Sequence, residues 1–390
     1  MSSSALRVVV VGGGLSGLTL AHGLSRAGMD VDVFDRDISA FDRRQGYELE
    51  IDPDGTRALA SCLPSKLQDL IEVTSGVPAR TLTVYSKREP VLQRDVAHDG
   101  DIYVDLFTLR QILLGDFGYR LHFGKVFTGF DEMDDHVVVR FADGTSAECD
   151  VLVGSDGVNS RVRQQLLPAM APEDTGVRAI FGRTPLMTRG MELLDSALIG
   201  NRVMATDPRH RAMMLMTMRF RERPDAAATH WAPDVPLAPR EDYVSWAVLF
   251  PANEFDDGKA DSNTLQDVAC ECVGPFPSGF RKVVEEGDPT DVAFTPIVES
   301  RTPEWATRRV TLIGDAIHAM PPVGTRCAST ALVDARVLTD RLRTAQVGNT
   351  DVLTAIHAYE DTMRSYAPDA AREAHAQLLH TMGFAGDKRG

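Results

Sequence analysis

A glycine-rich turn between two short β-branched runs constrains this chain more than any other feature of its sequence. Residues 12–17 read Gly-Gly-Gly-Leu-Ser-Gly and follow the strand-like run 6–11. They lead into the segment 15–27, whose apolar residues recur at helical spacing. A second β-branched run, 31–34, is followed by Asp35, 18 residues after the last glycine of the turn. This order of strand, turn, helix, strand and acid predicts a βαβ unit that binds the phosphates of a dinucleotide.

Each part of this unit has its own task at a dinucleotide. Gly12 permits the tight turn, Gly14 lets the backbone approach the pyrophosphate, and Gly17 lets the helix pack on the first strand. The first turn of the helix offers free N–H groups and the positive end of its dipole to the phosphates. Asp35 lies close to the distance expected of a carboxylate that binds ribose hydroxyls. The residues predicted to contact the dinucleotide here are Gly12, Gly14, Leu15, Ser16, Gly17 and Asp35.

Composition and charge argue against several classes of partner. The 390 residues carry a formal net charge of −15, which argues against binding nucleic acid or an anionic membrane surface. No apolar run is long enough to span a bilayer, and residues 1–5 are too short and polar to open a signal peptide. The five cysteines are scattered, and Cys270 and Cys272 lack the spacing of a zinc site. We therefore expect free thiols, no metal site and a cytoplasmic protein.

Helical and strand-like patterns alternate along the rest of the chain. Helical spacing is present in residues 56–63, 106–117, 325–343 and 350–381. Three short alternating runs lie between residues 125 and 153, with Asp143-Gly144 as a hairpin turn. The block 177–255 contains two longer strand-like runs, which predict a second, antiparallel layer, and residues 221–240 are predicted to be a loop. The chain is thus expected to leave its first domain near residue 175 and to return to it near 290.

Two further strand–turn segments carry an acidic residue at the turn. Residues 151–163 predict a strand, a turn at Asp156-Gly157 and the start of a helix. Residues 309–324 predict a buried strand that ends at Gly314-Asp315, where the carboxylate can accept hydrogen bonds from ribitol or ribose hydroxyls. The three signatures in this order resemble the single-component (class A) FAD-dependent aromatic hydroxylases over nearly the whole chain. Within that family the chain looks most similar to the tetracycline-inactivating flavin monooxygenases, which share segments 109–114, 200–205, 311–316, 320–322 and 332–335.

The resemblance implies an FAD-dependent monooxygenase. FAD would bind non-covalently, NAD(P)H would bind transiently as reductant without a dinucleotide domain of its own, and O2 would form a flavin hydroperoxide. One oxygen atom would then pass to an aromatic or polyketide-like small molecule by hydroxylation, epoxidation or Baeyer–Villiger oxidation. No general base can be identified in the sequence, so no catalytic residue is predicted. We expect a monomer or weak dimer.

The implied fold is α/β, with a Rossmann-like FAD-binding domain of the aromatic-hydroxylase type, an inserted, mostly antiparallel β-sheet substrate domain and a long C-terminal helix. The expected boundaries are 1–175 and 290–345 for the FAD-binding domain, 176–289 for the substrate-binding domain and 346–390 for the C-terminal helix. The FAD contacts implied are Gly12, Gly14, Leu15, Ser16, Gly17, Asp35, Arg36, Arg43, Arg110, Asp156, Asp315, Pro322 and Gly324. The substrate-pocket residues expected are Phe181, Arg202, Met204, Met213, Ser245, Trp246 and Pro321.

The loop after the third signature departs from the family's pattern. Where the family has a stretch close to GGxGxN, residues 324–329 read Gly-Thr-Arg-Cys-Ala-Ser, and Arg326 offers a positive charge in place of the lost backbone approach. Phe181 and Ser245 stand where related enzymes carry a glutamine and a histidine, which predicts a substrate other than tetracycline. Two alternatives stay open: a non-redox flavoprotein in which FAD shapes a pocket for cyclisation or ligand binding, and a protein that no longer holds FAD.

Overall fold

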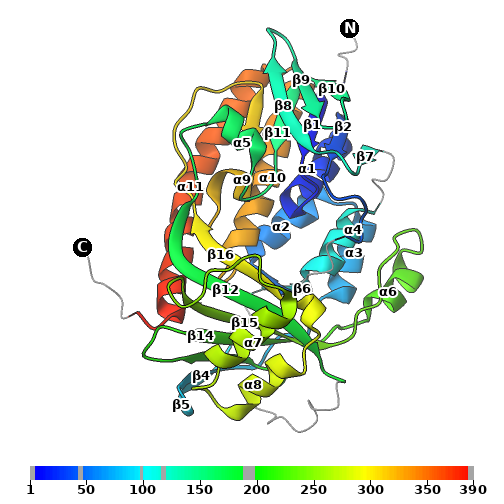
Figure 1. Cartoon of the computed structure of the whole chain (residues 1–390). Coiled ribbons are helices and arrows are strands. Elements are labelled where there is room, and N and C mark those ends of the chain that lie inside the picture. The colour runs from blue at the N-terminus through cyan, green and yellow to red at the C-terminus, as the bar shows by residue number, and fades with distance from the viewer. Residues whose placement is uncertain (1–4, 43–46, 97–99, 116–119, 188–197, 385–390) are drawn as a thin grey trace.

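A parallel five-stranded sheet forms one half of the molecule in the computed structural model (Figure 1). The structure describes residues 5–42, 47–96, 100–115, 120–187 and 198–384. In spatial order the strands are β17 (Val310–Leu312), β11 (Val151–Gly154), β1 (Arg7–Val11), β2 (Asp30–Phe34) and β7 (Leu121–His122). Four consecutive buried valines fill the central strand β1, as expected of a strand that is covered on both faces. The predicted Rossmann-like fold is confirmed.

Helices from both ends of the chain pack together beside this sheet. They are α1 (Leu15–Arg26), α2 (Pro53–Cys62), α3 (Ser65–Thr74), α4 (Leu106–Leu113), α10 (Arg326–Gln346) and α11 (Val352–Thr381). Helix α10 packs against α1, α2 and α11, and Figure 1 shows α11 along the outer edge of the molecule. The apolar residues of α1 at helical spacing, among them Leu18, Leu20 and Leu24, are fully buried in this core. The first and last parts of the chain therefore form one packed unit.

Smaller elements complete this half of the molecule. A three-stranded antiparallel sheet contains β8 (Phe127–Glu132), β9 (Val137–Phe141) and β10 (Ser146–Cys149). The predicted turn between β9 and β10 is present, with Gly144 at φ 82°. A two-stranded antiparallel ribbon pairs β3 (Glu48–Ile51) with β6 (Ile102–Asp105). The short helices are α5 (Arg161–Leu166), α9 (Asp315–His318) and the 3-10 turn Pro289–Asp291.

A seven-stranded sheet forms the second half. Its spatial order is β16 (Ala293–Glu299), β12 (Glu173–Pro185), β15 (Tyr243–Pro251), β14 (Ala212–Met218), β13 (Arg202–Thr206), β4 (Thr81–Ser86) and β5 (Glu89–Asp95). All neighbours are antiparallel except β4 and β13. Strands β4, β5 and β16 lie outside the range 176–289, so the sheet draws on more of the chain than its sequence pattern suggested. The division into domains remains a proposal.

The two faces of the seven-stranded sheet have different neighbours. Helices α7 (Ser262–Cys272) and α8 (Ser278–Glu285) cover one face, where Ile180, Trp246 and Phe280 belong to one buried cluster. Because side chains alternate along a strand, the residues next to these face the other way. That second face packs on the end of α11 and on the ribbon β3–β6. It therefore looks toward the half of the molecule that contains the parallel sheet.

Several predicted segments differ from the structure. The helix expected at 106–117 ends at Leu113 within the described residues, and residues 221–240 contain helix α6 (Pro224–Trp231). Pro224 stands at the first helical position, where its missing N–H costs nothing, so the proline begins this helix instead of marking a loop. Among the described residues, no helix combines the length and apolarity needed to cross a membrane.

Candidate active site

The three sequence signatures meet at the carboxyl ends of β1, β11 and β17. The Oγ of Ser155, just after β11, donates a hydrogen bond to the carbonyl oxygen of Gly12 at 2.7 Å. A side chain at Gly12, which has φ +113°, would clash with the backbone of Ser155. A side chain at Gly314 would come within 2.9 Å of the Oγ of Ser16. The chain therefore brings all three turns to one edge of the parallel sheet, where α/β proteins bind their ligands.

The N-terminus of α1 is open toward an anion. Gly14 is the N-cap residue, no side chain caps the helix, and its first turn carries no acidic residue. A Cβ at Gly14 would meet no atom within 4 Å, whereas one at Gly17 would clash with the carbonyl oxygen of Gly12. Gly14 thus leaves space above the end of α1, and Gly17 allows the helix to pack closely on the turn. Free N–H groups and the helix dipole make this end suitable for phosphate.

Asp35 lies buried at the end of β2, next to the glycine-rich turn. Its Oδ2 accepts a hydrogen bond from the N–H of Gly13 at 2.6 Å, and its Oδ1 accepts one from Asp37 N–H at 2.8 Å. Arg110 on α4 donates its Nε–H to the carbonyl oxygen of Gly13 at 2.9 Å and pairs with Asp37 at 3.0 Å. The arginine is 7% exposed, so it ties the turn to β2 from inside the protein.

Asp315 begins α9 directly after Gly314, which adopts φ +60°. Burial raises the pKa of the Asp315 carboxyl. The thiol of Cys327, at the start of α10, lies 3.7 Å from Asp315 Oδ1. Burial, with the nearby Cys327 and Asp315, raises the pKa of Tyr47 to about 12. Since the ring of Tyr47 also contacts Phe181 edge-to-face at 5.3 Å, this residue connects the third signature to the seven-stranded sheet.

A buried carboxylate network holds the third signature in place. Asp334 on α10 is fully buried and accepts hydrogen bonds from Gly314 N–H at 2.7 Å, from the His318 Nε2 at 2.6 Å and from the Tyr366 hydroxyl at 2.5 Å. Burial by itself lowers the pKa of His318. The adjacent Asp334 carboxylate raises this pKa by more than burial lowers it, so the net shift is upward. The Asp334–His318 pair therefore fixes the turn that presents Asp315.

The strand register divides the predicted pocket residues between the two faces of the seven-stranded sheet. Phe181 pairs with Ala247, Ala247 with Met214, and Met214 with Met204, so these side chains share the face that looks toward the parallel sheet. Arg202 lies two residues before Met204 on β13, and Ser245 lies two residues before Ala247 on β15, so both side chains are on that face as well. Met213 and Trp246 are instead buried under α7 and α8. We remove these two from the predicted pocket because a shift of one residue reverses the face of a strand side chain.

Comparison with known proteins identifies the family of the chain. Residues 111–374, more than half of its length, match the model of the FAD binding domain family. The chain belongs to this family. Residues 10–44 also match the NAD(P)-binding Rossmann-like domain, which covers the glycine-rich turn. The predicted family of FAD-dependent aromatic hydroxylases is confirmed.

Individual relatives cover this FAD-binding chain to different extents. The 6-hydroxynicotinate 3-monooxygenase of Bordetella bronchiseptica is 28% identical across 95% of this chain and 90% of that protein. The dual O-methyltransferase/FAD-dependent monooxygenase elcB of Phaeosphaeria nodorum is 27% identical across 98% of this chain, which spans only 44% of that protein. The tetracycline destructase Tet(51) has a TM-score of 0.70 at 16% identity, across 97% of this chain and 91% of that one. This structural similarity concerns the fold alone.

The groups at the three signatures fit FAD. The open space at Gly14 and the uncapped end of α1 suit a pyrophosphate. Carboxylates at Asp35 and Asp315 suit the hydroxyls of a ribose and a ribityl chain. Within the part of the chain that the structure describes, no group of three or more His, Cys, Asp or Glu side chains could hold a metal ion.

Other predicted FAD contacts have different positions. Asp156 accepts hydrogen bonds from the Ser160 hydroxyl and the N–H groups of Arg161 and Val162, so its carboxylate is engaged at the start of α5. Arg36 is exposed, and Arg43 lies outside the described residues. In the loop before α10, Pro321 is buried, whereas Pro322 and Gly324 are exposed.

Arg326 does not present a free positive charge. Its Nε pairs with Glu373 at 2.7 Å, and its Nη1 lies 3.4 Å from Asp52. These two carboxylates balance the positive charge that the sequence analysis expected Arg326 to offer. The structure gives no other cationic side chain in the loop 324–329.

A polar cluster that the sequence analysis did not identify lies between β3–β6 and the seven-stranded sheet. Glu50 pairs with Arg202 at 2.7 Å and accepts a hydrogen bond from the Tyr103 hydroxyl at 3.1 Å. Glu48, two residues earlier, is 6% exposed. The signal was available in the segment 48–51, Glu-Leu-Glu-Ile, where two acids alternate with apolar residues in a strand.

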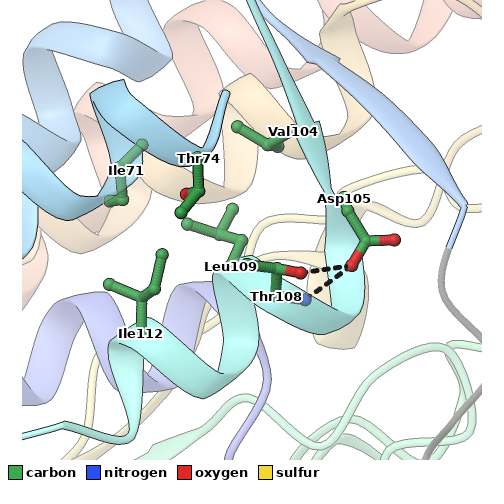
Figure 2. A pocket seen from close by; sticks show the side chains of 7 residues that line it. All are labelled: Ile71, Thr74, Val104, Asp105, Thr108, Leu109 and Ile112. Atoms are coloured by element: carbon green, nitrogen blue, oxygen red, sulfur yellow. Dashed lines mark hydrogen bonds between the residues drawn. The ribbon is translucent and has the colours of Figure 1, made fainter. Parts of the chain in front are cut away.

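A narrow crevice lies between α3, the end of β6 and α4. Figure 2 shows its walls, with Ile71 and Thr74 from α3, Leu109 and Ile112 from α4, and Asp105 at the N-cap of α4. The crevice has no room for a water molecule. Its lining residues include none of the residues at the three signature turns, so the crevice is not part of the dinucleotide site.

Proposed function

We propose that this chain is an FAD-dependent monooxygenase that uses NAD(P)H and O2 to oxygenate an aromatic or polyketide-like small molecule. One observation carries the proposal. The three signature turns, whose groups fit FAD, lie together beside the sheet face that carries Phe181 and Met204. The contact between Tyr47 and Phe181 joins the two regions. The five cysteines are all free, which supports a reducing cytoplasmic compartment.

FAD would be held at both ends by groups of this chain. The N–H groups at the start of α1 would bind the pyrophosphate, and Asp35 and Asp315 would bind sugar hydroxyls. When bound, the flavin supplies the redox chemistry that transfers oxygen. Arg110 would keep the glycine-rich turn in shape, since its guanidinium is already engaged by Gly13 and Asp37.

The apolar sheet face supports a flat substrate. Phe181, Met204 and Met214 contribute aromatic and thioether surface to one row of this face. Such side chains suit a planar ring and adapt to its outline. The relative that spans nearly the same length acts, by its name, on 6-hydroxynicotinate, a hydroxylated aromatic ring. We therefore place hydroxylated aromatic compounds first among the candidate substrates.

The first turn of α10 favours the second candidate, a non-redox flavoprotein. Cys327 has its thiol against Asp315 where the family has glycine, and Arg326 is neutralised by two carboxylates. Fewer charges would then stabilise the reduced ring. In this alternative, bound FAD would shape a pocket without being reduced during turnover.

One experiment separates these functions. The purified protein, loaded with FAD, is mixed with NADPH or NADH and a panel of aromatic and polyketide compounds under 18O2. A monooxygenase oxidises one equivalent of nicotinamide for each oxygen atom found in product by mass spectrometry. A yellow protein that never consumes NAD(P)H would instead indicate the non-redox alternative. Acid precipitation should release the flavin, and flavin retained in the pellet would contradict non-covalent binding.

Asp315→Ala is expected to weaken FAD binding by about ten- to a hundredfold. A charged hydrogen bond to a hydroxyl contributes about 1.5–3 kcal/mol, and every 1.4 kcal/mol corresponds to a factor of about ten in affinity. Fluorescence titration of the apoprotein with FAD measures the change. Asp156→Ala is the matched control: because that carboxylate caps α5, we expect lower stability with a smaller change in FAD affinity. Equal affinities of the wild-type and Asp315→Ala proteins would remove Asp315 from the site.

A further inference from the structure

Glu48 is a buried carboxylate with an unused oxygen. It lies on β3, its side chain is 6% exposed, and its Oε2 is buried without a hydrogen-bond partner. A buried polar atom left without a partner destabilises the folded state, so such atoms are rare in folded proteins. An acceptor oxygen of this kind is suited to a hydroxyl group that a ligand brings.

The neighbouring positive charge forms an ion pair with another carboxylate, while the Nε of the same arginine is buried without a hydrogen-bond partner. Arg202, on β13, lies close enough to favour the ionised form of Glu48, but its guanidinium pairs with Glu50 at 2.7 Å. On the ribbon β3–β6, the acidic and hydroxyl groups facing this region are Glu50, Asp101, Tyr103 and Asp105. The seven-stranded sheet contributes Tyr243, which donates its hydroxyl to Asp105, and Arg240 precedes that strand. On the other side of β3, α10 contributes Arg326, shared between Asp52 and Glu373.

The position of Glu48 joins the two halves of the candidate active site. Tyr47, the preceding residue, contacts Phe181 and lies near Asp315 at the third signature. Glu48 acts electrostatically on Tyr243 of β15 and is itself acted on by Arg202 of β13. A ring placed on the face of Phe181 and Met204 would therefore have this carboxylate at its border.

Burial gives Glu48 the proton affinity of a base that works near neutral pH. Desolvation raises its pKa to about 7, with Arg202 opposing the shift and Glu50 adding to it. A carboxyl group with such a pKa can bind and release a proton near neutral pH. A base with its pKa near the working pH combines a useful ionised fraction with a useful driving force.

We propose that Glu48 binds the ring hydroxyl of a hydroxylated aromatic substrate and takes its proton. This inference rests on the proposed function and specifies its substrate class. The hydroxyl O–H bond breaks, its electron pair stays on the substrate oxygen, and a new O–H bond forms at Glu48 Oε2. Nothing is oxidised or reduced in this step. The resulting arenolate is more electron-rich in the ring than the neutral phenol and therefore more reactive toward an electrophilic oxygen.

The test measures binding to the oxidised, FAD-loaded protein, without turnover. The probes are 6-hydroxynicotinate and 4-hydroxybenzoate, each paired with its O-methyl ether, and calorimetry between pH 5.5 and 8.5 gives the dissociation constants. For the wild-type protein we expect the hydroxyl compound to bind at least tenfold more tightly than its ether. Its dissociation constant should rise about tenfold per unit as pH falls below about 7, because Glu48 becomes protonated.

Three variants isolate the role of Glu48. Glu48→Gln should abolish both the hydroxyl preference and the pH step. Glu50→Gln should keep the step but move it to lower pH, because it removes a negative charge and frees Arg202 to stabilise ionised Glu48. Glu89→Gln, on the exposed edge strand β5, should change neither. FAD content and urea unfolding midpoints confirm that each variant is folded.

The outcomes separate this inference from the proposed function. A folded Glu48→Gln protein that keeps the hydroxyl preference and the same pH midpoint overturns the role of Glu48 and leaves the monooxygenase proposal standing. A wild-type protein that oxygenates only rings without a hydroxyl overturns the inference in the same way. Failure of every compound to bind or to promote NAD(P)H oxidation overturns both.

Discussion

Gly14→Val is expected to give a folded protein that purifies without flavin. In the structure, a Cβ at Gly14 meets no atom within 4 Å, and the residue has φ −87°, which any amino acid can adopt. The added side chain would instead occupy the space above the end of α1, where the pyrophosphate has to approach the backbone. We expect at least a hundredfold loss of FAD affinity, measured by fluorescence titration, with an unchanged urea unfolding midpoint of the apoprotein.

Gly17→Val is the matched control for this prediction. A Cβ at Gly17 would clash with the carbonyl oxygen of Gly12 and come close to Ser155, so the helix could no longer pack on the turn. This variant should lose stability as well as flavin. A Gly14→Val protein that stays yellow would show that FAD does not approach the backbone there.

Asp334→Asn is expected to lower the free energy of unfolding by about 3–5 kcal/mol, the usual cost of removing one partner from a buried ion pair. The carboxylate is fully buried, and three donors converge on it: Gly314 N–H, the His318 ring and the Tyr366 hydroxyl. Urea unfolding measures the loss. Asp340→Asn, a half-exposed position on the same helix, should change stability by less than about 1 kcal/mol.

The loss in Asp334→Asn should depend on pH in a defined direction. Burial opposes the charge on His318, but Asp334 raises its pKa above the ordinary value. A group whose pKa is raised on folding stabilises the protein fully below its unfolded pKa, about 6.5 for histidine, and this contribution disappears as pH rises through the folded pKa. The difference between wild type and variant should therefore be largest at pH 5.5 and smaller at pH 9. A difference that grows with pH would contradict a protonated His318.

Local patterns in the sequence predicted the FAD half of the molecule because each of its signatures is short and continuous. The turn at residues 12–17, the strand before Asp156 and the strand before Asp315 each consist of neighbouring residues whose spacing alone indicates their structure. The hairpin turn at Gly144 was predicted on the same basis.

The rest depended on contacts between distant segments. Nothing near Met213 or Trp246 in the sequence tells which face of their strands α7 and α8 will cover. The pairing of Arg326 with Glu373 joins residues 47 positions apart, so the sequence suggested a free charge. The sequence of segment 48–51 shows that two acids alternate with apolar residues, but the burial of Glu48 and its oxygen without a partner are seen only in the packed structure.

The parallel pairing of β4 with β13 has a consequence for how the molecule folds. Thr81 of β4 donates its N–H to the side chain of Asn201, 120 residues later. Strand β4 pairs with two strands: β5, which follows it directly, and β13, which comes much later in the chain. On a growing chain, the β4–β5 hairpin therefore waits until β13 has been synthesised, with an unpaired edge exposed meanwhile. Its exposed edge carries Val91 and Leu92, which makes this hairpin a point of aggregation risk during synthesis. Residues 176–289 expressed alone would lack β4, β5 and β16, so β13 and β12 would each lose one neighbouring strand of the sheet.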